Sequence, residues 1–486
     1  MKKILTAVFT IFALLIISAG CIIGETETEI VISDSGITVN GETASQSTRS
    51  AVYVGAEIIY YEEGQGSDYG EGKASDAHSV EEAEKHTVIT ITEPGTYRIS
   101  GKLSYGQIAV DLGYFAEIDK HAKINIILDG VDITCTAAPA IVFYNVFETE
   151  STETAGAVIT VADNSENFVN GSYIAKIYEE GSTDTLYKHD GAISSQQTLL
   201  IQGEEKGNGI LTVNGELEGI STKMHLTVNG GNLYVYASDD AINVNEERVS
   251  VFTMNGGFLY ANGKTDGVDS NGDIVLNSGT VISYGAGMDV EGGIDPDGVT
   301  ILNGGNLLTV GSGAMSADST SPFMKLSFTQ SSKAGSVISV TDTIGNEVAS
   351  YTVDTSFSAV LISSENFEFG KTYYVYVNGV RQQYTGYSAG TSSGSMMPAG
   401  DFGDKQMTGD KNEMKGGRNN ITRNQPTEFM QNQQMPQNIT DFTPTDMGGF
   451  GGGSMFGGGL TTSVEASYEF TLTKDSQNFS GVYDGL

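Results

Sequence analysis

The sequence predicts an all-β protein built around a parallel β-helix, a solenoid of stacked coils, and three observations support this. Residues 189–310 repeat one short pattern, in which a small acidic turn precedes a strand that closes on an Asn-Gly type of turn. The asparagines that close four successive strands are 26, 22 and 26 residues apart (Asn229, Asn255, Asn277 and Asn303). The apolar runs between them are short, β-rich and interrupted by Gly and Asn, which excludes long helices. Steps of about two dozen residues suit a β-helix, whereas a propeller blade needs about 40 residues.

One copy of the repeat is too short to bury its own apolar residues, so the copies must stack and share a core. We place this β-helix at residues 87–320, where β alternation begins and the repeats follow. Residues 321–387 and 461–486 alternate with period 2 and contain hairpin turns, which predicts a small C-terminal antiparallel β module that covers the last coil. The tract 388–460 is rich in Gly, Met and Gln and is predicted to be disordered.

The N-terminal residues have the features of a targeting segment. Lys2 and Lys3 precede an apolar stretch that ends in small residues before Cys21. This pattern resembles a lipoprotein signal, so we expect export, with Cys21 lipidated and the protein anchored to the outer face of the cell membrane or to the cell surface. Ser18 stands where Leu is usual, which leaves simple secretion open. Residues 22–50 are predicted to be a tether and residues 51–86 an acidic N-terminal cap or loop.

Composition limits the possible partners. The chain has 61 acidic and 25 basic residues, a net charge of −36, which argues against nucleic acid as a partner because phosphate binding relies on Lys and Arg. If Cys21 is lipidated, Cys135 is the remaining cysteine, so no intramolecular disulfide and no cysteine-based metal site is expected. We expect a monomer.

The acidic turns predict a calcium site. Neighbouring coils are about 4.8 Å apart, so carboxylates at the same point of each turn form a ladder and repel one another unless a cation neutralises them. Calcium takes six to eight oxygen ligands, to which amides such as Asn243, Asn245 and Asn271 can contribute. The alternative for each single residue is an aspartate that caps its own turn. The predicted metal ligands are Asp190, Glu218, Asp239, Asp240, Asp266, Asp269 and Asp289.

Sugars also bind by stacking on aromatic rings, and Trp is absent, so tyrosines must serve. Four tyrosines lie in the strands of the repeats, where packing is the alternative to ligand contact. The predicted carbohydrate-binding residues are Tyr234, Tyr236, Tyr260 and Tyr284.

Several stretches carry a family likeness: PGTYRISGKLSYGQIAVD, NIILDGVDIT, HDGAISSQQTLLIQG and the repeated units around LTVNGG. Together they resemble a family of exported bacterial and archaeal carbohydrate-binding proteins, which are right-handed parallel β-helices similar to calcium-dependent pectate lyases. The resemblance implies binding of acidic, pectin-like polysaccharide, of cellulose or of both, with calcium held by carboxylates on the coils. The sequence matches the family's acidic turns at Asp190, Asp239, Asp240, Asp266 and Asp289 and departs from them at Glu218.

The sequence thus favours a calcium-loaded, non-catalytic polysaccharide-binding protein on the cell surface. One alternative is a calcium-dependent polysaccharide lyase, whose reaction needs a base to remove a proton beside a uronate carboxylate. Lys223 is the candidate for that base, with Lys264 as a second, but basic residues are scarce in the repeats. Another alternative is a surface adhesin or structural spacer.

Overall fold

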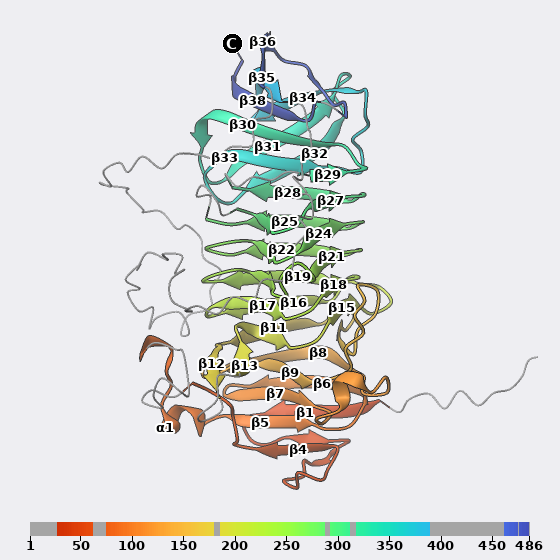
Figure 1. Cartoon of the computed structure of the whole chain (residues 1–486), viewed down its shortest axis with the longest axis vertical. Helices are drawn as coiled ribbons and strands as arrows, with labels where there is room; N and C mark the ends of the chain where they lie inside the picture. Colours follow the sequence, from red (N-terminus) through yellow and green to blue (C-terminus); the bar gives the residue numbers. More distant parts are fainter. Residues whose placement is uncertain are drawn as a thin grey trace, which may run out of the picture. The chain divides into compact units, whose positions relative to one another are not determined.

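The computed structural model describes residues 27–61, 74–178, 185–286, 292–311, 317–388, 461–474 and 476–485. Strands dominate this part of the chain, which confirms the prediction of an all-β protein (Figure 1). Within the described ranges, no helix has the length and apolar character needed to cross a membrane. The helical elements are the 3-10 helices η1 (Ala74–Asp76) and η2 (Ala116–Ile118) and the single-turn helix α1 (Val80–Ala83).

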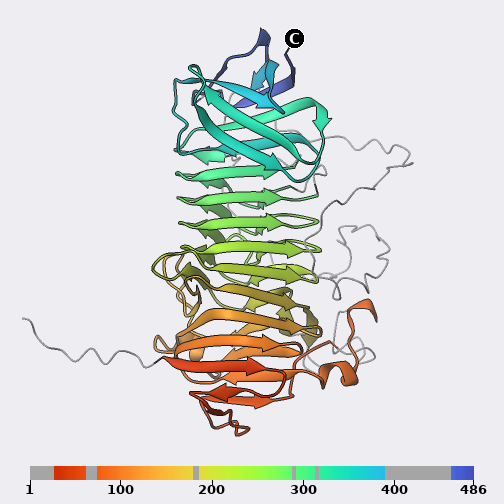
Figure 2. The ribbon, with the colours of Figure 1, turned by 180° about the vertical axis from the view of Figure 1, so that it is seen from behind.

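Strands of successive coils pair in parallel and form three ladders. Figures 1 and 2 show these strands stacked one above another. Ladder I is a nine-stranded sheet in which β4 (Val52–Gly55) adds an antiparallel edge to a run of parallel strands. Its parallel strands are β5 (Thr87–Ile91), β7 (Gly106–Asp111), β9 (Ile141–Asn145), β14 (Gly191–Ser195), β17 (Glu218–Thr222), β20 (Ile242–Val244), β23 (Val268–Ser270) and β26 (Ile294–Pro296).

Ladders II and III share the long strand β8 and separate after it, at β10 and β11. Ladder II contains β1 (Thr28–Ser33), β6 (Gly95–Leu103), β8 (Ile124–Cys135), β10 (Ala157–Val161), β15 (Leu199–Gly203), β18 (Leu226–Val228), β21 (Val251–Met254), β24 (Asp273–Leu276), β27 (Thr300–Leu302) and β29 (Ala317–Ser319). Ladder III continues from the second half of β8 through β11 (Glu166–Gly171), β16 (Ile210–Gly215), β19 (Asn232–Ala237), β22 (Phe258–Asn262), β25 (Thr280–Tyr284) and β28 (Asn306–Val310).

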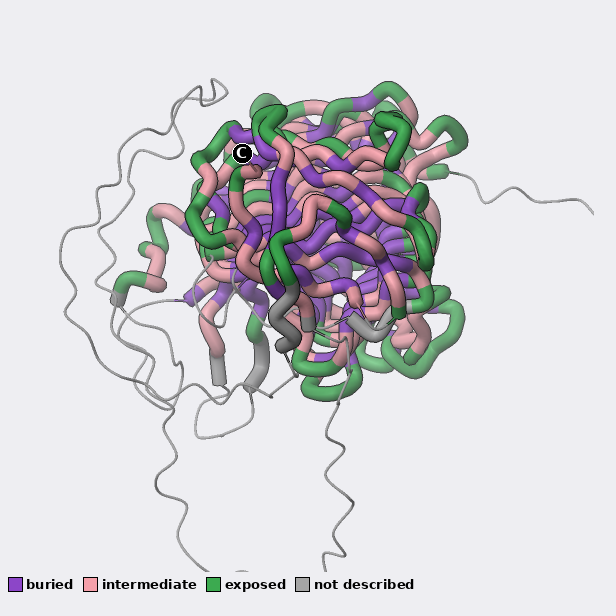
Figure 3. The backbone as a smooth tube through the Cα atoms, turned by 90° about the horizontal axis from the view of Figure 1, so that it is seen from above, coloured by how far each residue is buried: buried purple, intermediate pink, exposed green. Residues whose placement is uncertain are grey.

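The core lies between the ladders. The parallel register places apolar residues of one strand next to apolar residues of the following strand. Alternate residues of each strand point inward, so each coil buries its apolar side chains against those of the next coil. The tube in Figure 3 is accordingly buried inside and exposed at the outer turns. Two such stacks are Ile193, Ile220, Ile242, Val268 and Ile294 in ladder I and Leu211, Leu233, Leu259, Val281 and Leu307 in ladder III.

The structure differs from the predicted tether at 22–50. From residue 27 onward this segment carries β1, which pairs in parallel with β6, and the short strands β2 (Thr38–Val39) and β3 (Glu42–Thr43). Ile30 and Ile32 of β1 are fully buried in the core. The sequence did not predict this strand because the segment is rich in Ser and Thr and only two apolar residues of the strand point inward. A hairpin, β12 (Ile174–Tyr178) with β13 (Thr185–His189), leaves the stack before the repeats.

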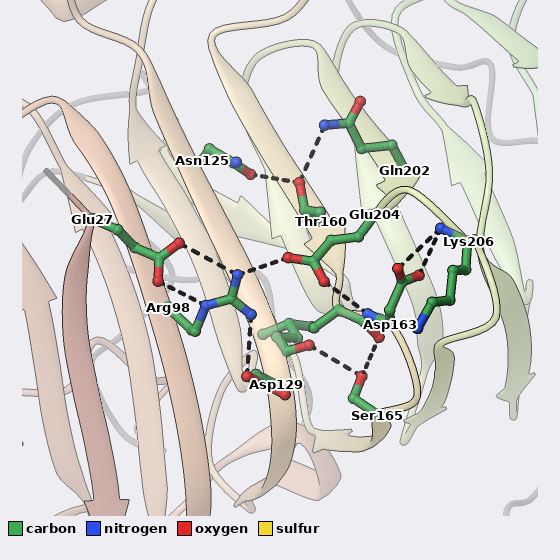
Figure 4. A network of polar contacts seen from close by, with 12 residues as sticks. Glu27, Arg98, Asn125, Asp129, Thr160, Asp163, Ser165, Gln202, Glu204 and Lys206 are labelled. Carbon is green, nitrogen blue, oxygen red and sulfur yellow. Dashed lines mark hydrogen bonds and ion pairs between the residues drawn. The ribbon is translucent and has the colours of Figure 1, made fainter. Parts of the chain in front are cut away.

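The outer side of the N-terminal coils carries a charge network centred on Arg98 of β6, drawn in Figure 4. Its guanidinium contacts Glu27 at 2.7 Å, Asp129 at 3.1 Å and Glu204 at 2.7 Å. Glu204 also accepts the backbone N–H of Asp163 at 2.8 Å. The contact between Arg98 and Glu204 joins residues that lie 106 positions apart in sequence.

A C-terminal β module follows the last coils and pairs mainly antiparallel, except that β30 and β38 run parallel. It is joined to ladder III by antiparallel pairing of β28 with β33. Its strands are β30 (Phe323–Ser332), β31 (Ser336–Asp342), β32 (Glu347–Val353), β33 (Phe357–Ser363), β34 (Thr372–Val377), β35 (Val380–Ser388), β36 (Thr461–Ser467), β37 (Phe470–Thr471) and β38 (Asn478–Asp484). The predicted targeting segment with Cys21 and, apart from Ser388, the predicted disordered tract lie outside the described residues.

Candidate functional site

The acidic turns lead into the strands of ladder I and are stacked by its register. Ile220, Ile242 and Val268 are partners in successive strands. Glu218, Asp240 and Asp266 each lie two positions earlier and therefore stand at equivalent places in three successive coils. All three carboxyl groups are buried, with residue exposures of 5%, 7% and 5%.

Glycine follows two of these acids because the next coil passes very close. A Cβ added to Gly219 would lie 2.5 Å from the carbonyl oxygen of Ala241, and one added to Gly267 would lie 2.6 Å from that of Gly293. Real side chains do not tolerate such contacts with backbone. The Glu-Gly and Asp-Gly pairs of the repeat are therefore a packing requirement that also fixes where each carboxyl group lies.

Asn243 links two of the stacked acids, and we name Glu218, Asp240 and Asn243 the acidic cluster. The amide nitrogen Nδ2 of Asn243 donates to Glu218 Oε1 at 2.7 Å and to Asp240 Oδ2 at 3.2 Å. Two other oxygens, Glu218 Oε2 and Asn243 Oδ1, are buried without a hydrogen-bond partner among the described residues. Buried polar atoms normally have partners, so these two oxygens mark an unfilled bonding capacity.

The electrostatics of the acidic cluster favour a bound proton or cation. Burial, followed by the charges of Asp190 and Asp240, holds the pKa of Glu218 well above its usual value, and the Ser221 hydroxyl offsets only part of this rise. Burial raises the pKa of Asp240 to about 8, and the charges of Asp239, Asp269 and Asp266 add to the effect. Near neutral pH the cluster therefore retains protons unless a cation replaces them.

Three other predicted ligands are held by contacts within the fold. Asp266 Oδ1 accepts the backbone N–H of Gly292 at 2.7 Å, and its own N–H donates to Asp240 Oδ1 at 2.9 Å. Asp239 Oδ1 accepts the hydroxyl of Thr265 at 2.5 Å. The carboxylate of Asp190 forms an ion pair with Lys188 at 2.7 Å. Such contacts are typical of acids that stabilise turns, which is the alternative to metal binding given above for each single residue.

Asp269 lies on the outer side of ladder I, one coil beyond Asn243. The register pairs it with Asn243 on one side and with Asp295 on the other. Burial raises its pKa to about 7, helped by the negative charges of Asp295, Asp297 and Asp239. Asp295 and Asp297 were not among the predicted ligands, although the Asp-Pro-Asp turn of the sequence was a usable signal for them.

Across the described residues, no group of three or more His, Cys, Asp or Glu side chains is arranged to hold a metal ion. Asp289, one of the predicted ligands, lies outside the described residues. Lys223, the candidate base, follows the end of β17 opposite to Glu218, and its ammonium group is 3.9 Å from Glu246. The structure thus does not bring that lysine to the acidic cluster.

Three of the predicted tyrosines form a patch on the outer side of ladder III, with Phe258 beside them. Tyr234 pairs in register with Tyr260, and Tyr236 pairs with Asn262. The ring centroids of Tyr234 and Phe258 are 5.4 Å apart, and those of Tyr236 and Tyr260 are 5.6 Å apart. Tyr236 is 36% exposed and the other rings are half-buried. We name Tyr234, Tyr236, Phe258 and Tyr260 the tyrosine face.

Tyr284 differs from the other predicted tyrosines, because it is only 1% exposed and packs in the core shared with the C-terminal module. Its hydroxyl accepts the backbone N–H of Asp354 at 3.3 Å. The carboxylate of the same Asp354 accepts the Tyr260 hydroxyl at 3.0 Å, and Asn262 donates to that hydroxyl at 3.5 Å. Asp354, which the sequence reasoning missed, therefore borders the tyrosine face.

Comparison with known proteins assigns the chain to a family. A family model described as carbohydrate-binding domain-containing protein matches residues 85–369, more than half of the chain. The chain belongs to this family. The match includes the acidic cluster, the tyrosine face and Asp354, and it ends before β35 of the C-terminal module.

The chain is similar to a curated relative and to a solved structure. The relative, with the same description as the family model, comes from Acetivibrio thermocellus and is 33% identical over 186 residues, which is 38% of this chain and 54% of the relative. The chain thus spans about half of that relative's length. A solved structure of a polysaccharide lyase-like protein from C. thermocellum, a gadolinium derivative, covers 58% of this chain and 94% of its own, with 20% identity and a TM-score of 0.34.

Proposed function

We propose that this chain is a non-catalytic, calcium-binding protein of the cell surface that binds polysaccharide, namely acidic pectin-like glycans, cellulose or both. The observation that carries the proposal is the tyrosine face, a half-exposed patch of four rings on a family member whose relatives are described as carbohydrate-binding. An exposed aromatic patch with polar groups at its edge is typical of a binding surface.

The chemistry of the tyrosine face suits a sugar chain. Aromatic rings offer flat apolar surfaces for the C–H faces of pyranose rings, and phenol groups supply hydrogen bonds to hydroxyls. Asn214 and Asn262 lie in register with Tyr236 on either side of it, so amide donors and acceptors flank the exposed ring. The rings repeat with the coil spacing of about 4.8 Å. A glycan chain that lies along the stack would therefore meet rings on the two successive coils that carry β19 and β22.

Binding to insoluble cellulose and to immobilised polygalacturonate tests this proposal. We expect the double variant Y234A/Y236A to lose at least about tenfold in affinity, or about 1.4 kcal/mol. The matched control is Y114A, because Tyr114 is 87% exposed and belongs to a different turn. Wild-type protein that is retained on neither matrix, or a double variant that binds as well as Y114A, would overturn the proposal.

Calcium belongs to the proposal because the acidic cluster fits a hard cation. Glu218 Oε2 and Asn243 Oδ1 are buried oxygens without hydrogen-bond partners among the described residues, and calcium takes carboxylate, amide and water oxygens. Glu218, Asp240 and Asn243 are the residues that would hold it. When bound, calcium would neutralise the buried carboxylates and could link the protein to the carboxylates of an acidic glycan, which a chain of net charge −36 otherwise repels.

The remaining parts of the proposal concern architecture and location. The parallel ladders support a right-handed parallel β-helix as the fold of the repeats. Export with lipidation of Cys21 would hold the monomer at the outer face of the membrane, which metabolic labelling with a fatty acid tests directly. A C21A variant that still incorporates the label would contradict the anchor and leave the binding proposal untouched.

A further inference from the structure

The C-terminal module carries a second aromatic surface, on the side of its sheet that faces away from the module core. Along β34, Tyr373, Val375 and Val377 are buried, whereas Tyr374 and Tyr376 alternate with them and are half-buried. Arg381 on β35 pairs in register with Tyr376 and therefore lies on the same side. Tyr483 of β38 lies nearby, in register with Gln383 two positions after Arg381.

The guanidinium of Arg381 lies against two tyrosine rings. Its central carbon lies 3.7 Å from the centroid of Tyr374 and 4.9 Å from that of Tyr468. Tyr468 itself packs against Gly485, where a Cβ would collide with the ring. Contact with the two rings restrains the guanidinium and leaves its edge as the part that can form hydrogen bonds.

Arg381 has no carboxylate partner among the described residues, although the chain carries a net charge of −36. Two acids of neighbouring strands are engaged elsewhere. Asp484 accepts the side-chain amide of Gln382 at 2.9 Å, and Asp342 accepts backbone N–H groups of its own turn at 2.8 and 3.0 Å. In contrast, Arg98 contacts three carboxylates.

Two polar atoms beside the stacked rings are also unsatisfied. Arg381 Nε and Thr341 Oγ1 are buried without hydrogen-bond partners among the described residues, and Thr341 pairs in register with Tyr374. Two orphaned polar atoms beside one ring are uncommon in a purely structural surface. They are expected where a ligand completes the arrangement.

We propose that Arg381, with Tyr374, Tyr376, Tyr468 and Tyr483, forms a subsite for the carboxylate of an acidic saccharide. A planar guanidinium matches a carboxylate with two parallel hydrogen bonds, and the half-buried tyrosines provide faces for a sugar ring. This subsite lies beyond residues 85–369 of the family match and needs no metal. It rests on the proposed function only in the choice of a saccharide as ligand.

Calorimetric titration with a galacturonic acid trisaccharide in the presence of a chelator tests the subsite, because calcium bridging at the acidic cluster is then absent. We expect R381Q to bind at least about tenfold more weakly than wild type, with R381K intermediate because lysine keeps the charge but not the planar fork. The matched control is R49Q, since Arg49 is an exposed arginine near the other end of the chain. R49Q is expected to bind like wild type.

Three results would overturn the proposal: equal affinity of R381Q and R49Q, no binding of the trisaccharide by wild type, or equally tight binding of an acidic peptide such as triglutamate. Thermal unfolding of R381Q and R381K establishes that both variants are folded. Cellulose binding by wild type in the same buffer separates the two proposals. If it persists while the trisaccharide fails to bind, the Arg381 subsite is wrong and the tyrosine face stands.

Discussion

Two groups of carboxylates, one partly exposed and one buried, lie on the same stack of coils and are neutralised very differently. In the Arg98 network, Glu27, Asp129 and Glu204 surround one guanidinium. In the acidic cluster, Glu218 and Asp240 share the neutral amide of Asn243, and two oxygens remain without partners among the described residues. Each carboxylate of the Arg98 network therefore has an ion-pair partner within the fold, whereas the acidic cluster retains oxygens that have no partner among the described residues.

The difference appears in the pKa values. Hydrogen bonds from the Asp163 backbone and from Arg98 lower the pKa of Glu204, so this carboxylate stays charged. Burial and neighbouring negative charge raise the pKa of Asp240 to about 8. A carboxylate with an internal partner stabilises the fold as an ion, while one without a partner stabilises it only when a proton or an external cation is bound. The comparison therefore separates a structural network from a candidate binding site.

The largest expected effect is on the pH dependence of stability. Because Asp240 and Asp269 have pKa values of about 8 and about 7 in the fold, against 3.8 ordinarily, the folded chain holds protons that the unfolded chain releases above about pH 4. In chelator, the free energy of unfolding should fall by about 6 kcal/mol between pH 5 and pH 8, when the contributions of both groups are added. Calcium should restore it at pH 8. Urea denaturation across this range measures both effects, and stability that rises toward pH 8 in chelator would refute the raised pKa values.

Replacement of Arg98 by methionine tests the Arg98 network. In R98M three carboxylates lose their common partner, so we expect a loss of about 2 kcal/mol of unfolding free energy at neutral pH. The loss should shrink at acidic pH, because the lowered pKa of Glu204 means that its contribution disappears as pH falls through that pKa. The control is K102M, which removes one exposed ion pair with Asp132 and should cost less than about 1 kcal/mol. Equal losses for the two variants would show that the network adds nothing to a single ion pair.

Replacement of Glu218 by glutamine tests the acidic cluster as a calcium site. E218Q should weaken calcium binding at least about tenfold, or about 1.4 kcal/mol. In chelator at pH 8 it should be more stable than wild type, because folding of wild type must either bury the Glu218 charge or take up a proton, and this gain should vanish below about pH 4. Calorimetry and thermal unfolding measure the two effects. The control E246Q changes an acid that lies 3.9 Å from Lys223, and loss of calcium binding in that variant would argue against the cluster as the site.

The smallest effect is expected in the uncharged ladder of asparagines. Asn255 donates to Asn229 at 2.9 Å and accepts from Asn277 at 2.8 Å, both at exposed positions. N255A should cost about 0.5–1 kcal/mol without a dependence on pH or calcium. A clear pH dependence in N255A would mean that the contrast between the two carboxylate groups is not electrostatic in origin.

Much of this molecule could be predicted from short-range patterns. The asparagine spacing located the turns between ladders II and III, and Asn229, Asn255, Asn277 and Asn303 indeed bond to one another in sequence. The acidic turns predicted the positions of Glu218, Asp240 and Asp266 because each acid keeps its place in a repeat. The tether was wrong from residue 27 onward because the pairing of β1 with β6 spans about seventy positions, which no local pattern reports.

The sequence by itself determined the period of the coils, the all-β class and the recurrence of one acid and one asparagine per turn, since these follow from local alternation and turn chemistry. Only the tertiary structure decided which polar groups find partners for hydrogen bonds, ion pairs or ring contacts. It places Asp354 against Tyr260, 94 positions away, and covers Tyr284 with the C-terminal module. It also gives Arg98 three carboxylates and Arg381 two tyrosine rings. The physical reason is that burial and charge pairing depend on which strands meet, and strands distant in sequence supply most of these partners.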